Sequence, residues 1–191
     1  RIEPDSIVVE VVKEIGVVPP VPPLVGNNLT LQPGWNFISV PKGLNDSCDQ
    51  FGELFNIPEI DVFYTYDPAT GFNTPMSSGY IEVLDGYWAN ANTAVNITLE
   101  YKTEGATLPP SKALTGDKWN AIGFSSVKAT STSATLMSVE GSWSTVLGWD
   151  TTAGNYESAI IYKANDEELM YPGKGYWLWM TQDDVLSAIG A

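Results

Sequence analysis

Acidic side chains are the residues of this chain best suited to chemistry, because it contains 23 Asp and Glu, no His and one Cys. Pairs such as Asp183-Asp184 and Glu167-Glu168 could supply the two carboxylates that glycoside hydrolysis needs. Neighbouring residues on a strand point to opposite faces, however, and both pairs have the character of solvated loop or helix-cap charges. Without imidazole, His-dependent triads and His-ligated zinc are excluded. We therefore expect no catalytic residue, no cofactor and no enzymatic activity.

The charge balance bears on the partners of the protein. Nine Lys and Arg stand against the acidic residues, which gives a formal net charge of −14. Such a field repels a phosphate backbone, so we expect no nucleic-acid partner. Carboxylates are the ligands that calcium prefers, and calcium is the one ion that this composition favours. The alternative is an ordinary solvated acidic surface, and no metal ligands are identified.

Two residue types are candidates for covalent modification. Cys48 has no second Cys in the chain, so it is either a small buried residue or an intermolecular crosslink. Three Asn-x-Ser/Thr sequons mark glycosylation candidates at Asn28, Asn45 and Asn96. Sequons also arise by chance. Asn28 is the strongest of the three because it follows a proline-rich stretch.

Exposed tryptophans would offer a different function, the stacking of sugars. Trp177 and Trp179 alternate on a predicted strand and so point the same way, and Trp143 and Trp149 lie earlier in the same half of the chain. Large aromatic residues are more often structural, and the repeated placement of these residues favours core packing.

The elements that must position these residues come in two copies of one unit. Three landmarks recur in the same order: a Trp-Asn strand, a Tyr/Trp-Asp turn ending in Gly, and a Gly-Tyr-Trp strand. The separations between equivalent residues are 84 (Trp35 to Trp119), 83 (Asp67 to Asp150) and 89 (Trp88 to Trp177). The pattern predicts a mostly β protein with two tandem sandwich-like or barrel-like repeats, over 27–108 and 109–191.

Local patterns within each repeat predict individual elements. In the first strand, Trp35, Phe37 and Ser39 should face one way, and the alternate residues the other. Each Asp should close a hairpin turn whose Gly takes a positive φ. Short helices are expected from Ser47 to Phe55, after Ser133, and over 181–189, where Thr181 and Asp184 would form a capping box. The strand over 95–101 then has no counterpart in the second repeat, which would leave a sheet edge open.

The first 26 residues form an arm with a strand-like start and a stiff proline-rich end. An open sheet edge invites pairing with another strand. We therefore expect the apolar part of the arm to add to the edge of a neighbouring molecule, or to fold back on its own chain. The residues concerned are Ile7, Val8, Val9, Val11 and Val12.

The Gly-Trp-Asn strand that opens the first unit and the Gly-Tyr-Trp strand near the end of each resemble repeats of archaeal, and some bacterial, cell-surface proteins. The second copy departs from this pattern, with Asp117-Lys118 where Gly34 stands in the first. The resemblance is greatest to an archaeal S-layer or proteinaceous sheath. It implies a secreted structural glycoprotein of the cell envelope that assembles with copies of itself into a layer, sheath or filament. The alternative is a surface adhesion or carbohydrate-binding module, with glycans or other envelope proteins as partners. No apolar stretch is long enough for a transmembrane segment.

Overall fold

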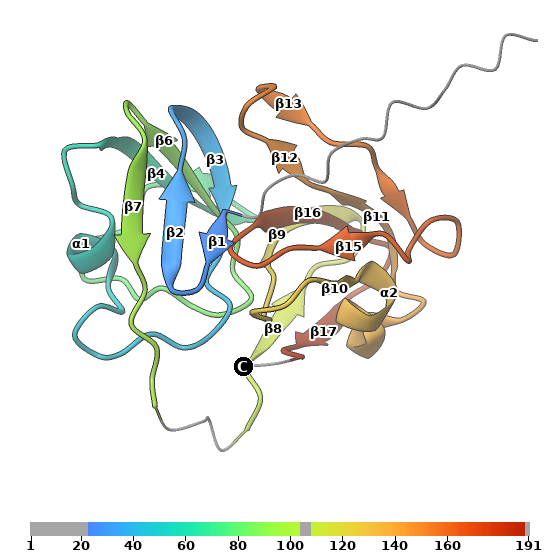
Figure 1. The fold of residues 1–191 in the computed structure, drawn as a ribbon. Helices are drawn as coiled ribbons and strands as arrows, with labels where there is room; N and C mark the ends of the chain where they lie inside the picture. Colours follow the sequence, from blue (N-terminus) through green and yellow to red (C-terminus); the bar gives the residue numbers. More distant parts are fainter. Residues whose placement is uncertain (1–22, 104–107, 190–191) are drawn as a thin grey trace, which may run out of the picture.

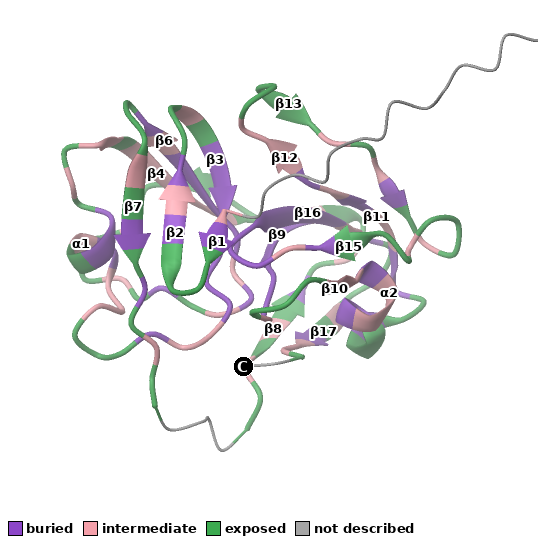
Figure 2. Ribbon diagram, viewed as in Figure 1, coloured by how far each residue is buried: buried purple, intermediate pink, exposed green. Residues whose placement is uncertain are grey.

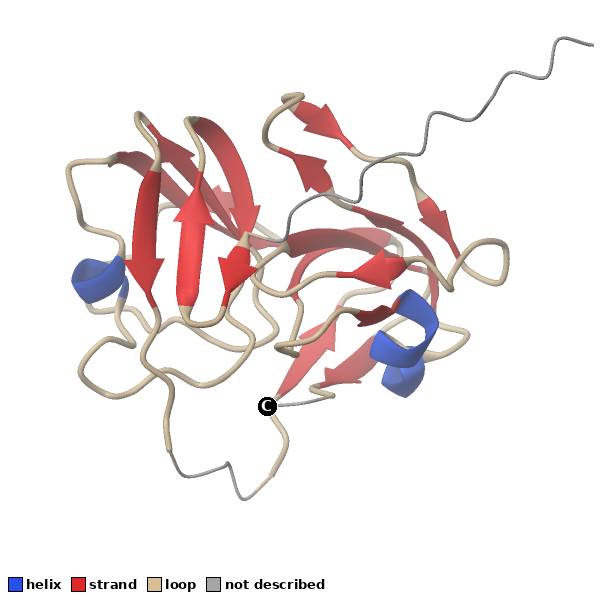
Figure 3. Ribbon diagram, viewed as in Figure 1, coloured by secondary structure: helices blue, strands red, loops and turns tan. Residues whose placement is uncertain are grey.

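A computed structural model describes residues 23–103 and 108–189 and confirms a mostly β protein, shown in Figure 1 and, by element type, in Figure 3. The first repeat contains β1 (Leu24–Val25), β2 (Asn28–Leu31), β3 (Gly34–Ile38), α1 (Phe51–Leu54), β4 (Ile60–Asp67), β5 (Gly71–Asn73), β6 (Tyr87–Ala91) and β7 (Val95–Thr98). The second contains β8 (Ser111–Leu114), β9 (Lys118–Gly123), β10 (Thr130–Ser131), α2 (Thr132–Thr135), the 3-10 helix η1 (Met137–Val139), β11 (Trp143–Leu147), β12 (Trp149–Asp150), β13 (Asn155–Tyr156), β14 (Ile160–Ile161), β15 (Leu169–Met170), β16 (Gly175–Met180) and β17 (Asp184–Ser187).

Each repeat is a small sandwich of two antiparallel layers. In the first repeat, β1-β2-β7 packs against β3-β6-β4-β5, and Leu29 and Ile97 of one layer share a core with Ile38 and Tyr87 of the other. The second repeat pairs β8 with β17 and covers them with β14-β11-β16-β9. Figure 2 shows buried residues running along the inner strands of both repeats.

The end of the chain corrects the prediction of a last helix over 181–189. Residues Asp184–Ser187 instead form β17, which pairs antiparallel with β8 and places Leu186 in the core. Asp184 takes no part in a capping box, because it begins this strand; its carboxylate accepts hydrogen bonds from the Ser142 hydroxyl at 2.6 Å and from the Val185 N–H at 2.8 Å. These bonds, the Ser142 hydroxyl first, lower the pKa of Asp184. The second repeat therefore does contain the counterpart of β7, and the predicted missing strand is wrong.

The other two helices are shorter than predicted. The first begins at Phe51, where Gln50 and Glu53 form a capping box, so Ser47 is not its cap. Its apolar face is as predicted, with Phe51, Leu54 and Phe55 all buried. The second is capped by Ser131, whose hydroxyl accepts the Ala134 N–H, and not by Ser133. Four-residue helices hold so few backbone bonds that packing decides where they begin.

The Asn of each Trp-Asn strand has a structural role that the sequence pattern did not reveal. Asn36 is buried; its Oδ1 accepts the Gln32 N–H, and its Nδ2 donates to the carbonyls of Gln32 and Gly34, at 2.8–3.0 Å. Asn120 makes the same three bonds, to Thr115 and Lys118, at 2.9–3.2 Å. The second turn is one residue longer, yet the amide fastens it in the same way.

The two repeats are joined by a layer of aromatic rings. Phe37 and Trp88 of the first repeat pack with Ala121 and Trp177 of the second in one buried cluster. The backbone bridges there also come in equivalent pairs, because Ile38 pairs with Lys174 and Ile122 pairs with Asp85. The predicted alternation of the first strand is confirmed. Phe37 faces this joint, Ser39 bonds to the Lys174 carbonyl across it, and Ile38 lies in the core of its own repeat.

Candidate functional site

The predicted Asp-x-x-x-Gly hairpins are confirmed, and each reaches across the joint toward the other repeat. Asp67 Oδ1 accepts the N–H groups of Ala69 and Thr70, and these bonds lower the pKa of Asp67. Asp150 makes the equivalent turn in the second repeat. The closing Gly residues take positive φ in both, +84° at Gly71 and +65° at Gly154.

These hairpins make matched contacts. Tyr66 packs edge-on against Trp177 with 4.6 Å between ring centroids, and Trp149 does the same against Trp88 at 5.2 Å. The indole N–H of Trp149 also donates to the Trp35 carbonyl at 2.8 Å. The joint is thus an approximately two-fold arrangement of two fused units, and it fixes the position of everything that lines it.

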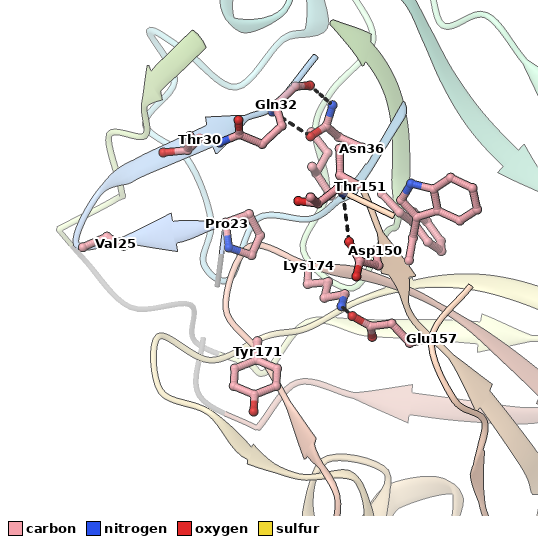
Figure 4. Close-up of a pocket in the computed structure, with 14 residues that line it drawn as sticks. Pro23, Val25, Thr30, Gln32, Asn36, Asp150, Thr151, Glu157, Tyr171 and Lys174 are labelled. Carbon is pink, nitrogen blue, oxygen red and sulfur yellow. Dashed lines mark hydrogen bonds and ion pairs between the residues drawn. The ribbon is translucent and has the colours of Figure 1, made fainter. Parts of the chain in front are cut away.

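A pocket of about 500 Å³ opens at this joint, between β1, β2 and β3 of the first repeat and the β12–β13 hairpin of the second (Figure 4). Phe37, Ile38 and Trp149 supply apolar surface. Polar groups come from Thr30, Gln32, Asp150, Thr151, Thr152, Glu157 and Tyr171. The volume lies within the usual range for small-molecule sites.

An ion pair between a buried lysine and a half-buried glutamate lies in the wall of this pocket. Lys174 is 6% exposed, and its ammonium pairs with the carboxylate of Glu157, as Figure 4 shows. Removing one partner of such a pair would leave a buried charge uncompensated, so the pair holds the hairpin side of the pocket in place. Because the charges cancel, the pocket wall offers hydrogen bonds without a net charge at this point.

The tryptophans considered for sugar stacking divide between core and surface. Trp143 and Trp177 are buried, so neither can form a platform. Trp149 is half-buried in the pocket wall, and Trp179 is half-buried beside Trp119, with 5.3 Å between ring centroids. Core packing is therefore confirmed for Trp143 and Trp177. Of the four tryptophans, Trp149 and Trp179 remain accessible to a ligand.

A second feature is the outer edge of β4 in the first repeat. β5 pairs only with Thr65 to Asp67, so residues 60–64 of β4 pair with β6 on one side and with no described strand on the other. In the second repeat the equivalent edge, on β11, is covered by β14, which pairs with Thr145 and Val146. The second repeat has six more residues before its Gly-Tyr-Trp strand, and the longer stretch contains β14, whereas β15 has a counterpart in the bridge of Tyr80 with Gln50.

The exposed edge borders a shallow pocket of about 420 Å³. Its lining includes Phe51 of α1, Phe55 just after it, the edge residues Ile60 to Tyr64, and Pro75, together with the polar residues Asn56, Thr74 and Ser77. Phe63 of β4 is the equivalent of Val146 of β11, because both pair with the same position of the Gly-Tyr-Trp strand and both follow a β-bulge. Phe63 is only partly buried, whereas Val146 is fully buried and shares a core with Ile160. The first repeat thus has an open pocket beside β4 where the second repeat has the strand β14 beside β11.

The three sequon asparagines are all exposed. Asn28 and Asn96 lie on the paired strands β2 and β7, where Asn28 stands opposite Thr98 and Thr30 opposite Asn96. Each Thr hydroxyl donates to the Asn carbonyl oxygen across the strands, at 3.1 and 2.7 Å. Among the described residues, neither Asn Nδ2 group donates a hydrogen bond, and this is the atom that a glycan would occupy.

The remaining candidates are placed as follows. Cys48 is half-buried against the first core, with its thiol 3.6 Å from the Glu100 carbonyl. Glu167 and Asp183 are exposed and bond to Ser133 and Gly116, so neither acidic pair faces a pocket. Within 23–103 and 108–189 no group of three or more Asp, Glu, His or Cys side chains could hold a metal ion.

The assembly arm, from Ile7 to Val12, lies outside the described residues, and so does most of the predicted segment 1–26. The last residues of that predicted segment belong instead to the first repeat, because Leu24 and Val25 form β1, which pairs with β2. No helix in the described part of the chain has the length and apolar character that a bilayer crossing would need. Neither a family model, nor a curated protein, nor a solved structure matches the chain.

Proposed function

We propose that this chain is an extracellular structural subunit that assembles with copies of itself into a layer, sheath or filament of a cell envelope. The two repeats support this role because large aromatic rings of each, Trp88 and Trp177 among them, join one unit to the other. Such a joint makes a stiff two-unit block, which suits a load-bearing subunit.

The observation that carries the proposal is the uncovered edge of β4. Strands that end a sheet present unpaired N–H and C=O groups and readily pair with another chain unless they are protected. Here the second repeat protects its edge with β14, and the first repeat leaves the equivalent edge beside an open pocket. An uncovered strand edge of this kind favours association between subunits.

We place the exposed face of β2 and β7 on the outer surface of the assembled layer, away from contacts between subunits. Asn28 and Asn96 place two sequons side by side on that face, and a glycan on either would keep it out of a protein interface. The location in the cell envelope rests on the sequence resemblance to cell-surface repeats. Within it, the sheet of β2 and β7 is the face turned to the medium.

The pocket at the joint favours a second candidate, a carbohydrate-binding surface module. It combines the half-buried ring of Trp149 with amide, hydroxyl and carboxylate groups, the mixture that saccharides require. Binding of a saccharide there would be lost in Trp149→Ala and retained in Trp179→Ala, whose ring lies outside the pocket.

Imaging of the purified full-length protein separates the two functions. Negative-stain microscopy and sedimentation over a range of concentrations, with and without calcium and reductant, should show ordered assemblies for a structural subunit. A monomer at every concentration that binds saccharides in a glycan array would contradict self-assembly and support the second candidate.

A further inference from the structure

The uncovered edge of β4 has a specific occupant available in the sequence. Resting on the proposed self-assembly, we propose that residues Ile7–Val12 of a neighbouring copy add to this edge as an antiparallel strand, in the position that β14 occupies in the second repeat. The subunits would then be linked by strand donation between copies.

The second repeat supplies the backbone template. Tyr162 N–H donates to the Ser144 carbonyl at 3.0 Å, so alternation along β11 turns the backbone groups of Val146 toward β14 as well. Phe63 is the equivalent of Val146, because both pair with the same position of the Gly-Tyr-Trp strand. The N–H and C=O of Phe63 therefore face the open edge, and an added strand would bond to them.

The side chains of the arm match those of β14. In β14 the buried Ile160 lies opposite Val146, and the exposed Ile161 lies opposite Thr145. If the arm adds as a strand with Glu10 toward solvent, the alternation of the sequence would turn Ile7, Val9 and Val11 inward. Val9 would then cover Phe63 as Ile160 covers Val146, and Glu10 would lie opposite Val62.

The position of the arm favours a neighbouring copy over the same chain. β1, where the arm joins the fold, lies against the second repeat, and Gly173 closely approaches Leu24 there. α1, beside the open edge, lies at the far end of the first repeat in Figure 1. The residues that connect Val12 to the described chain, 13–22, include three prolines, all within 19–22, and a proline-rich stretch of sequence favours an extended backbone. The attachment point at β1 therefore lies away from the open edge of its own repeat, and this separation favours the edge of a neighbouring copy.

Donation of this type is head-to-tail, because the donor and the acceptor are different surfaces. Each subunit would donate one strand and accept one. A contact of this kind forms a closed ring only if the rotation between neighbouring subunits returns to the first copy, and otherwise continues as an open chain. Strand donation at β4 therefore generates a linear series of subunits, the simplest element of a filament or sheath.

Cysteine pairing between separate chains tests this register. In a Cys48→Ser background, one protein carries Val62→Cys and a second carries Glu10→Cys, with Val8→Cys and Val12→Cys covering shifts by two residues. Opposed side chains on antiparallel strands lie close enough for a disulfide. After mixing and oxidation we expect a covalent heterodimer for one of the three donors. Thr145→Cys is the matched control, since β14 occupies its edge, and it should crosslink to none of them.

Each outcome decides the matter. Ordered assemblies without any crosslink at Val62 would overturn the strand position and leave the structural function standing. Crosslinking only within one chain that carries both cysteines would show that the arm covers its own edge, and would overturn donation. A monomer in all conditions would refute both proposals. As a measurement free of substitutions, a synthetic peptide of residues 5–14 in excess should shorten wild-type assemblies, and unchanged lengths would count against the site.

Discussion

Replacing Asn120 by Ala tests whether the buried amide of each repeat is a main determinant of its stability. The side chain is 1% exposed and makes three hydrogen bonds to the turn before β9, to Thr115 N–H, Thr115 C=O and Lys118 C=O. A typical intramolecular hydrogen bond contributes about 1 kcal/mol net, so their loss should cost about 3 kcal/mol. Thr115 and Lys118 are exposed, so water can hydrogen-bond to the backbone groups that the amide leaves. The loss of stability should therefore stay below the upper limit of about 4.5 kcal/mol for three hydrogen bonds.

Urea unfolding followed by tryptophan fluorescence measures this loss directly. For a chain of this size, about 3 kcal/mol lowers the melting temperature by roughly 6–12 °C. Asn36→Ala removes the same three bonds from the first repeat and should cost a similar amount. Asn155→Ala, at an exposed hairpin position, is the control and should change stability by less than about 0.5 kcal/mol. A loss below about 1 kcal/mol for Asn120→Ala would refute the role given to the amide.

Three further predictions follow from the joint, the turns and the sequons. Gly175→Ala should destabilise the protein by about 1–3 kcal/mol in urea unfolding, because the new Cβ would lie 2.5 Å from Phe37 Cδ2; a wild-type midpoint would contradict this. The lowered pKa of Asp67 stabilises the fold above its unfolded value of 3.8, and this contribution is lost as pH falls through the folded pKa. Asp67→Asn should therefore weaken the dependence of the unfolding midpoint on pH below about 4, and an unchanged dependence would show that the turn does not stabilise the carboxylate. Peptide mass spectrometry of protein from its native source should find a glycan on Asn28 or Asn96, and bare peptides at both would remove that assignment.

The pattern of the sequence was sufficient for the fold class and for the repeat. Trp35 and Trp119 begin equivalent strands, and Asp67 and Asp150 close equivalent turns, because alternation and turn chemistry act over a few residues. The same local reasoning failed at the end of the chain. Thr181 to Asp184 looked like a helix start, yet pairing with β8 buried Leu186 in a strand. Pairing partners more than 60 residues away are not visible in a local pattern.

The candidate sites show the same division. The sequence identified Asn28 and Asn96 as sequons, and only the register of β2 against β7 brought them onto one face. The larger offset of the last landmark, 89 residues against 83, was visible in the sequence. That the difference corresponds to β14, and that its absence leaves Phe63 half-buried, required the sheet order.

The amino-acid sequence by itself determined that two aromatic β units exist and where their three landmark strands and turns lie, because these depend on side-chain alternation and on residues next to one another. The tertiary structure alone decided how the units meet and which edge stays open. Burial of Phe37, Trp88 and Trp177 in one shared cluster, and the covering of β11 but not β4, depend on contacts between distant strands. Those contacts form where apolar surface and backbone groups can be satisfied together, a condition that applies to the whole chain and not to any single segment of it.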